Sequence, residues 1–305
     1  MKKHLKLGLS LISLLCITSC NENSEVEATL IAPNGTPLLA IANYLHERPL
    51  INETVVEGST PLLSAFTSKE YDLILAPINL GAQMYNKTKD YQLFETVVWG
   101  NLYVASRNEI KSFTDLKDKN ITLFGTNQTP DIVMKCLSSY YNISYNVTRV
   151  DEVSTANASL LQNTADYIVS AEPSLSKLKE KISNLYTLDL QEEWKKFSGL
   201  SSYPQAGIFV KKESVDKLKG ELSYLKNTIK NILKDTSYTV TCALEQEKLA
   251  SLGESTLASA LPNCHIGIED NQKQAIEFYF NKLNEINLSA QYGGVLPSED
   301  FYLTI

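Results

Sequence analysis

The chain has 305 residues, 43% of them apolar and 21% charged, which is ordinary globular composition and too long for one minimal core. The formal net charge is −7, and the 28 basic residues are scattered along the chain. Nucleic acid is therefore excluded as a partner, because a phosphate backbone requires a continuous cationic face. We expect two lobes.

The first residues have the order of a secretory signal. Lys2, Lys3, His4 and Lys6 precede an apolar run over residues 7–17. This run is shorter than the ~20 residues that a membrane-spanning helix needs. Export from the cytoplasm follows.

The apolar run ends in Ile17-Thr18-Ser19-Cys20, which resembles the bacterial lipobox. We therefore predict a lipoprotein signal peptide over residues 1–20 and lipidation of Cys20, which would anchor the chain to a membrane of the bacterial envelope, facing the periplasm or the cell exterior. Residues 21–27 are polar and are expected to form a flexible tether. An ordinary signal peptide cleaved near Ser19 is the alternative.

From Ala28 the chain repeats a short apolar run, a turn rich in Gly, Pro or Asn, and an amphipathic segment. This repetition is typical of βαβ units and a largely parallel sheet. Residues 93–106 then read as extended chain with Trp99-Gly100 in the middle. The expected strands are residues 28–33, 54–57, 71–77, 121–124, 147–150, 167–169 and 205–210, and helices are expected after most of them, near 159–163, and at 217–233 and 272–286.

This order predicts an α/β protein of two lobes, each a mainly parallel sheet flanked by helices. The first lobe is expected to be discontinuous, with residues 28–106 and 205–305. Residues 107–204 would form an inserted second lobe. The two crossings, near residues 105 and 205, would make a hinge.

Several segments resemble the type II periplasmic binding-protein family of ABC importers, in the branch with carriers of sulfonates, nitrate, thiamine precursors and riboflavin. The resemblance covers nearly the whole chain after residue 27, with Asp118 standing where the family usually has glycine. It implies a monomeric solute-binding protein that delivers a small molecule to a membrane permease, without cofactor or catalysis. The segments are residues 32–37, 71–77, 113–119, 165–169, 172–173, 203–207 and 293–302.

In an open α/β sheet the ligand lies beyond the carboxyl ends of the strands, next to helix N-termini. Small hydroxyl and amide side chains in such turns orient a ligand without reacting with it. The structural alternative is helix capping by the threonines and turn geometry at the glycine. Our candidates are Asn34, Gly35, Thr36, Ser59, Thr60, Asn79 and Trp99 in the first lobe, Thr126, Gln128, Thr129 and Glu172 in the second, and Tyr203 near the second crossing.

Three of these candidates bear on ligand identity. Trp99 and Tyr203 could stack on a flat ring, the alternative for Trp99 being the core between the lobes. A carboxylate of Glu172 facing the cleft would select a cationic or hydrogen-bond-donating ligand. We therefore expect an aromatic or heterocyclic vitamin or precursor, such as a thiamine precursor or riboflavin, with a sulfonate or taurine-like anion as the next choice.

Motifs of catalysis are missing from the sequence, which has no G-x-S-x-G, H-E-x-x-H or P-loop. By the resemblance, the same fold also hosts enzymes of thiamine-precursor and menaquinone biosynthesis, and an envelope ligand sensor would share every residue named above. We expect no metal site. Cys242 and Cys264 either pair as a disulfide or remain two buried thiols.

Overall fold

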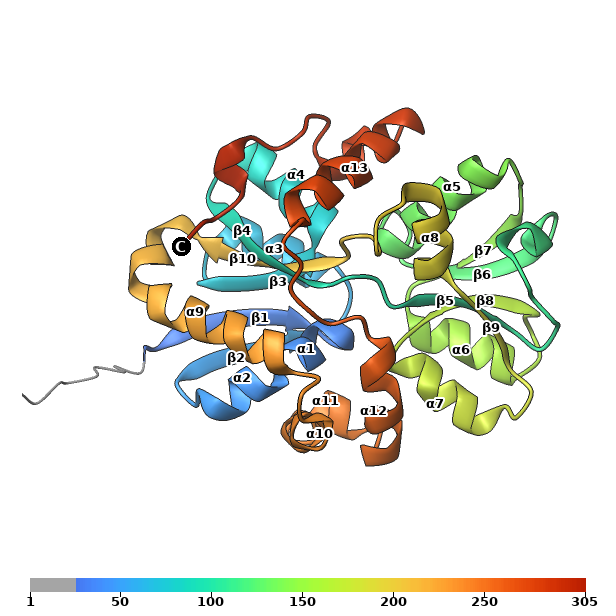
Figure 1. Cartoon of the computed structure of the whole chain (residues 1–305), viewed down its shortest axis with the longest axis horizontal. Coiled ribbons are helices and arrows are strands. Elements are labelled where there is room, and N and C mark those ends of the chain that lie inside the picture. Colours follow the sequence, from blue (N-terminus) through green and yellow to red (C-terminus); the bar gives the residue numbers. More distant parts are fainter. Residues whose placement is uncertain (1–25) are drawn as a thin grey trace, which may run out of the picture.

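The computed structural model describes residues 26–305 and contains two five-stranded sheets. The strand order is β2-β1-β3-β10-β4 in the first sheet and β7-β6-β8-β5-β9 in the second. Figure 1 shows the two sheets side by side, each flanked by helices. The predicted two-lobed α/β architecture is confirmed.

In each sheet one strand runs against the others. β10 is antiparallel to β3 and β4, and β5 is antiparallel to β8 and β9, whereas β1 pairs in parallel with β2 and β3, and β6 with β7 and β8. The sheets are therefore mainly parallel, as predicted. The strands are β1 (Ala28–Pro33), β2 (Ile51–Val56), β3 (Leu73–Pro77), β4 (Tyr91–Val98), β5 (Leu102–Ser106), β6 (Asn120–Phe124), β7 (Asn146–Val150), β8 (Tyr167–Ala171), β9 (Tyr186–Asp189) and β10 (Ala206–Lys211).

The helices connect these strands in the βαβ manner. Those between strands of the first sheet are α1 (Thr36–Ala40), α2 (Ala42–Glu47), α3 (Thr60–Ser68) and α4 (Ile78–Thr88). Those of the second lobe are α5 (Thr129–Tyr141), α6 (Val153–Leu161), α7 (Ser174–Lys181) and α8 (Leu190–Ser198). The C-terminal helices are α9 (Val215–Asn231), α10 (Thr236–Ala243), α11 (Glu247–Ala250), α12 (Glu254–Ala260) and α13 (Gln272–Glu285).

The first crossing between the sheets lies at residues 99–101, earlier than the expected position near 105. β5, which we expected in the first lobe, pairs with β8 and β9 of the second sheet. Gly100 makes the abrupt passage possible, because its φ of 82° is disfavoured for other residues and a Cβ there would lie 2.6 Å from Cγ of Gln191. The second crossing follows α8 and ends at β10.

The C-terminal segment contacts both lobes, although the sequence placed it in the first lobe alone. α12 packs against α7, and α13 packs against α5. Figure 1 shows α12 beside α7, and α13 on the same side of the molecule as α8. Lys177 of α7 donates to the carbonyl of Leu252 at 2.9 Å, and Thr256 of α12 donates to Glu180 at 2.5 Å. These contacts tie the second lobe to the chain beyond β10.

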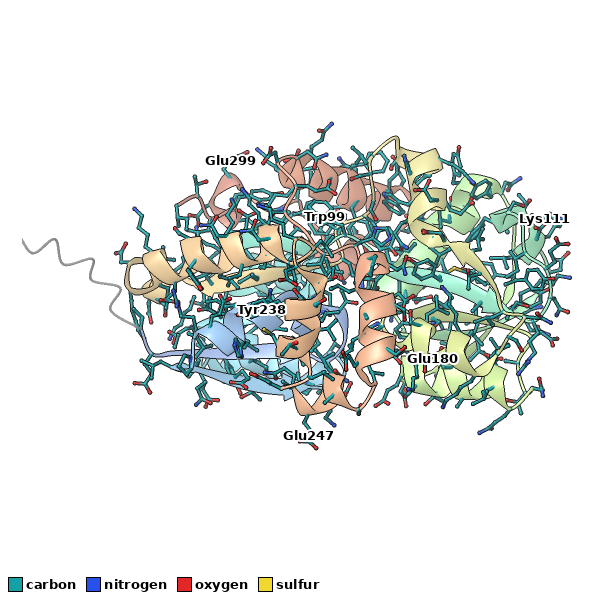
Figure 2. All side chains as sticks on the ribbon, turned by 60° about the horizontal axis from the view of Figure 1, so that its bottom comes forward. Trp99, Lys111, Glu180, Tyr238, Glu247 and Glu299 are labelled. Atoms are coloured by element: carbon teal, nitrogen blue, oxygen red, sulfur yellow. The ribbon has the colours of Figure 1, made fainter. Side chains whose placement is uncertain are left out.

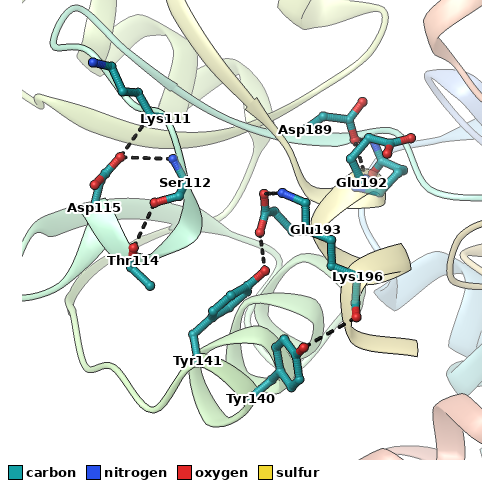
Figure 3. Close-up of polar contacts among 11 residues, drawn as sticks. Lys111, Ser112, Thr114, Asp115, Tyr140, Tyr141, Asp189, Glu192, Glu193 and Lys196 are labelled. Carbon is teal, nitrogen blue, oxygen red and sulfur yellow. Dashed lines mark hydrogen bonds and ion pairs between the residues drawn. The ribbon is translucent and has the colours of Figure 1, made fainter. Parts of the chain in front are cut away.

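Within the second lobe, hydrogen bonds join α5 to α8, as Figure 3 shows. The hydroxyl of Tyr141 donates to the buried carboxylate of Glu193 at 2.6 Å, and Lys196 donates to the same carboxylate at 2.7 Å. Asp189 caps α8 by accepting the backbone N–H of Gln191 and of Glu192. These bonds fix α8, which leads to the second crossing.

The N-terminal predictions lie outside the described residues. They are the signal peptide over residues 1–20, the lipid on Cys20, and the tether as far as residue 25. Among residues 26–305, no helix is both long and apolar enough to span a membrane.

Candidate ligand-binding site

A cavity of about 500 Å³ lies between the two lobes. Its lining comes mainly from the turns that follow β1, β2, β6, β7 and β8, with further residues from both crossings and from α11. This is the carboxyl-end location at which open α/β sheets bind ligands. Seven predicted site residues line it, namely Asn34, Gly35, Thr36, Ser59, Gln128, Thr129 and Glu172.

A second cavity of about 220 Å³ adjoins the first and shares Ser59, Pro77 and Gln128 with it. Three other predicted site residues, Thr60, Asn79 and Thr126, line this second cavity and not the first. The turns selected from the sequence are thus gathered from both lobes into two neighbouring cavities.

Trp99 and Tyr203 line neither cavity, so the expected ring stacking by these two residues is wrong. Trp99 is 3% exposed, and its indole N–H donates to the carbonyl of Gly267 at 3.2 Å. Tyr203 is fully buried and donates to Oε1 of Gln191 at 2.5 Å. Figure 2 places Trp99 in the middle of the molecule. Both residues fill the core at the crossings, which was the alternative considered for Trp99.

Asn101 joins the two crossings and the two lobes. Its Nδ2 donates to Oγ1 of Thr36 at 2.8 Å and to the carbonyl of Glu172 at 3.0 Å. Its Oδ1 accepts from Nε2 of Gln205 at 2.7 Å, and the hydroxyl of Thr36 also donates to the Glu172 carbonyl at 2.8 Å. Thr36 therefore acts as a bridge between the lobes in this structure, besides lining the main cavity.

Glu172 lines the main cavity, but its carboxylate interacts with α7. Oε2 accepts the backbone N–H of Ser176 at 2.9 Å, and Oε1 lies 3.9 Å from Nζ of Lys179. The side chain is buried, and Oε1 accepts no hydrogen bond from residues 26–305. Burial raises the pKa of Glu172 above its ordinary value of 4.5, against the lowering effects of Ser176 and Lys179.

Replacing Glu172 with glutamine is expected to stabilise the protein at neutral pH and not at acidic pH. Because the pKa of Glu172 is raised in the folded chain, the folded chain keeps a proton that the unfolded chain loses above pH 4.5. The protonated Glu172 side chain therefore stabilises the wild-type fold at low pH, and this stabilisation is lost as pH rises through the raised pKa. Glutamine keeps an acceptor for Ser176 and does not ionise. Thermal denaturation of both chains from about pH 4 to about pH 8 measures this. An effect independent of pH would contradict the expectation.

Sequence reasoning found Glu172 but missed the other charged residues of the main cavity. Glu57, Asp151 and Glu152 line it, with Lys248 of α11 as the one basic side chain among the described lining residues. The three carboxylates follow β2 and β7 directly, so the rule that selected the other turns applies to them equally. Lys248 could not have been found in this way, because α11 reaches the cavity only through tertiary packing.

The cysteines of the described chain do not pair. Cys136, Cys242 and Cys264 are free and buried, so the disulfide alternative for Cys242 and Cys264 is not formed in this structure. Burial raises the pKa of Cys136 to about 12 and raises that of Cys264 as well, which keeps both as unreactive thiols at neutral pH. Within residues 26–305, no three His, Cys, Asp or Glu side chains gather as a metal site would require.

No protein-family model matches the chain, and no curated protein matches it significantly. Solved structures do. An ABC transporter structure from Parabacteroides distasonis superposes with a TM-score of 0.79 at 19% identity, covering 92% of this chain and 99% of that one.

Two sulfonate-binding structures are also similar. The periplasmic aliphatic sulphonate binding protein SsuA from Escherichia coli has a TM-score of 0.65 at 13% identity, covering 89% of this chain and 92% of that one. The alkanesulfonate-binding protein SsuA from Xanthomonas axonopodis pv. citri, bound to MOPS, has a TM-score of 0.62 at 13% identity, covering 88% and 94%. The chain therefore has the two-lobed fold of the type II periplasmic solute-binding proteins of ABC importers.

Proposed function

We propose that the chain is the solute-binding lipoprotein of an ABC importer. It captures a small nutrient between its lobes and delivers it to a membrane permease as a monomer tethered through Cys20. The observation that carries the proposal is the cavity of about 500 Å³ between the lobes, lined by turns from both sheets. Cavities of roughly 300–1,000 Å³ with a few placed polar groups are typical of small-molecule sites.

Hinge motion at the two crossings would open and close the cavity. Asn101 and Gln205 lie on the two crossings and are bonded to each other, so they stay together while the lobes rotate about them. Contacts between the lobes, such as that between Gln128 and Ser59, would break on opening. Reversible capture needs no more chemistry than this, and the proposal includes no reaction.

The preferred ligand is a heterocyclic nutrient that carries positive charge or several hydrogen-bond donors. Phe124 and Leu62 offer apolar contact for a ring, together with the prolines of the lining turns. Glu57, Asp151 and Glu152 make the lining acidic, with Lys248 opposing them. A sulfonate remains the second choice, supported by the helix N-termini at the cavity and by the fold shared with sulfonate-binding proteins.

A thermal-shift screen of the chain from residue 22 onward tests both choices. Thiamine, riboflavin, taurine, MOPS and nitrate are added separately, and a ligand at about 100 times its Kd is expected to add about 2.7 kcal/mol to the folded state. Stabilisation by a vitamin without turnover supports the proposal. Stabilisation by sulfonates alone reverses the ligand preference, and chemical conversion of a compound contradicts the proposed function.

A further inference from the structure

A side-chain contact between the two lobes lies where the smaller cavity adjoins the main one. Nε2 of Gln128, from the second lobe, donates to Oγ of Ser59, from the first lobe, at 2.8 Å. Both residues line both cavities. The bonded pair therefore stands between two compartments of one cleft. A turn of the Gln128 side chain about its flexible bonds would connect them.

The two compartments differ in charge. The main cavity is lined by four carboxylate residues, Glu57, Asp151, Glu152 and Glu172, and by one lysine from the described chain. None of the described residues that line the smaller cavity is charged. Its polar groups beyond Ser59 and Gln128 are the hydroxyls and amides of Thr60, Asn79, Gln83, Thr126, Asn127 and Gln291. Such groups both donate and accept hydrogen bonds, which matches ligand hydroxyls and amides. An ion would lose its hydration there without gaining a counter-charge.

Two amides of the smaller cavity are held in place by the chain after α13. Nδ2 of Asn79 donates to the carbonyl of Gln291 at 3.3 Å, and Nε2 of Gln83 donates to the carbonyl of Ala290 at 3.1 Å. Asn79 is 5% exposed, and its Oδ1 accepts no hydrogen bond from residues 26–305. These two bonds fix the orientation of the Asn79 and Gln83 amides in the wall.

We propose that the smaller cavity is a second subsite, which takes an uncharged, hydroxyl-bearing part of the ligand while its charged or ring-bearing part occupies the main cavity. The inference rests on the proposed function and extends it. A volume of about 220 Å³ holds roughly seven water molecules at ~30 Å³ each, enough for a five-carbon polyol. Gln128 separates the compartments and moves aside when such a ligand enters.

Three matched five-carbon compounds test the subsite without knowledge of the full ligand. They are ribitol, its carboxylate ribonate, and its amine 1-amino-1-deoxyribitol. Crystals of the full chain are soaked with each, and affinities are measured by titration calorimetry. Ribitol is expected in the smaller cavity, and each charged compound is expected to bind there about tenfold more weakly or not at all. Absence of ribitol from this cavity, or equal occupancy by the charged compounds, overturns the inference.

Two variants make the test specific. Thr126→Trp fills the smaller cavity from an exposed position that does not line the main cavity, and it is expected to abolish ribitol binding. Thr241→Trp, at an exposed position of α10 outside both cavities, is the matched control and is expected to bind ribitol as the wild type does. Ribitol binding that survives Thr126→Trp would overturn the inference.

The subsite and the proposed function fail in different ways. A screened nutrient that stabilises the wild type and the Thr126→Trp chain equally, with no ribitol in the smaller cavity, overturns the subsite and leaves the proposed function in place. If no screened nutrient stabilises the wild type, the proposed function is contradicted. The subsite is then contradicted as well, because it is proposed as part of a nutrient site.

Discussion

Replacing Trp194 with alanine is expected to lower the free energy of unfolding by about 3–5 kcal/mol, the range for large aromatic side chains removed from a core. The side chain is fully buried. Its ring lies edge-on to Phe197 and Tyr203 at 5.2 and 5.4 Å, and to Phe278 and Tyr279 of α13 at 6.2 and 5.8 Å. Trp194 therefore connects the second lobe, the second crossing and the C-terminal segment. Chemical denaturation of the two chains measures the loss.

Trp194→Phe is the matched control. The indole N–H of Trp194 has no acceptor among residues 26–305, so phenylalanine removes volume without breaking a hydrogen bond. The expected cost is less than half that of alanine, because most of the aromatic contact remains. An equal loss of unfolding free energy in the two variants would show that the volume filled by the Trp194 ring is not the source of the stability. If the folded alanine variant no longer binds ligand, the contact between α8 and α13 also sets the relative position of the two lobes.

Neutralising the acidic lining is expected to weaken binding of a cationic ligand by about ten- to a hundredfold. The variant combines Glu57→Gln, Asp151→Asn and Glu152→Gln, which keep side-chain shape and remove three negative charges from the main cavity. Each partly solvated charge pair contributes on the order of 0.5–1 kcal/mol, and every 1.4 kcal/mol changes affinity tenfold. Titration with thiamine, a heterocyclic cation, measures the loss. Unchanged affinity would remove the electrostatic basis of the ligand preference.

A control must alter the net charge by the same amount elsewhere. Glu192→Gln, Glu213→Gln and Glu299→Gln neutralise three exposed carboxylates that line neither cavity. Thiamine affinity is expected to stay within about twofold, since exposed charges farther than ~10 Å from the ligand are screened at 0.1 M salt. An alkanesulfonate without an amino group gives the opposite sign, because loss of the three carboxylates favours an anion in the main cavity. Equal effects of both triple variants on thiamine would indicate a long-range field rather than local contacts.

Most strands and the helices α1 to α5, α9 and α13 could be predicted from the sequence because their signals are local, whereas β9, α7, α8 and α10 to α12 were not predicted. A buried strand is a short apolar run bounded by turn residues, and β1, β6 and β10 begin within one residue of their predicted starts. The helix predicted near residues 159–163 overlaps only the end of α6, because residues 153–161 are mostly small and polar and carry little periodicity. Predicted boundaries were least accurate where the chain is amphipathic and half exposed, as in β2.

The candidate site was predictable for the same reason, since strand-end turns can be recognised in sequence and parallel strands bring them to one edge. Ten of the twelve proposed residues line one of the two cavities. The two that do not, Trp99 and Tyr203, are aromatic residues at the crossings. Their composition fits ring stacking and core packing equally well, and only the surrounding chain decides between these roles.

The sequence by itself determined the fold class, the order of the βα units and the turns that meet between the lobes, because hydrophobic periodicity and turn chemistry act over a few residues. Tertiary structure alone decided which sheet receives residues 102–106, where the carboxylate of Glu172 interacts, and that Lys248 reaches the main cavity. The physical reason is that a mainly apolar extended segment such as residues 93–106 has no local preference among strand partners. Strand pairing and burial of the whole chain select them.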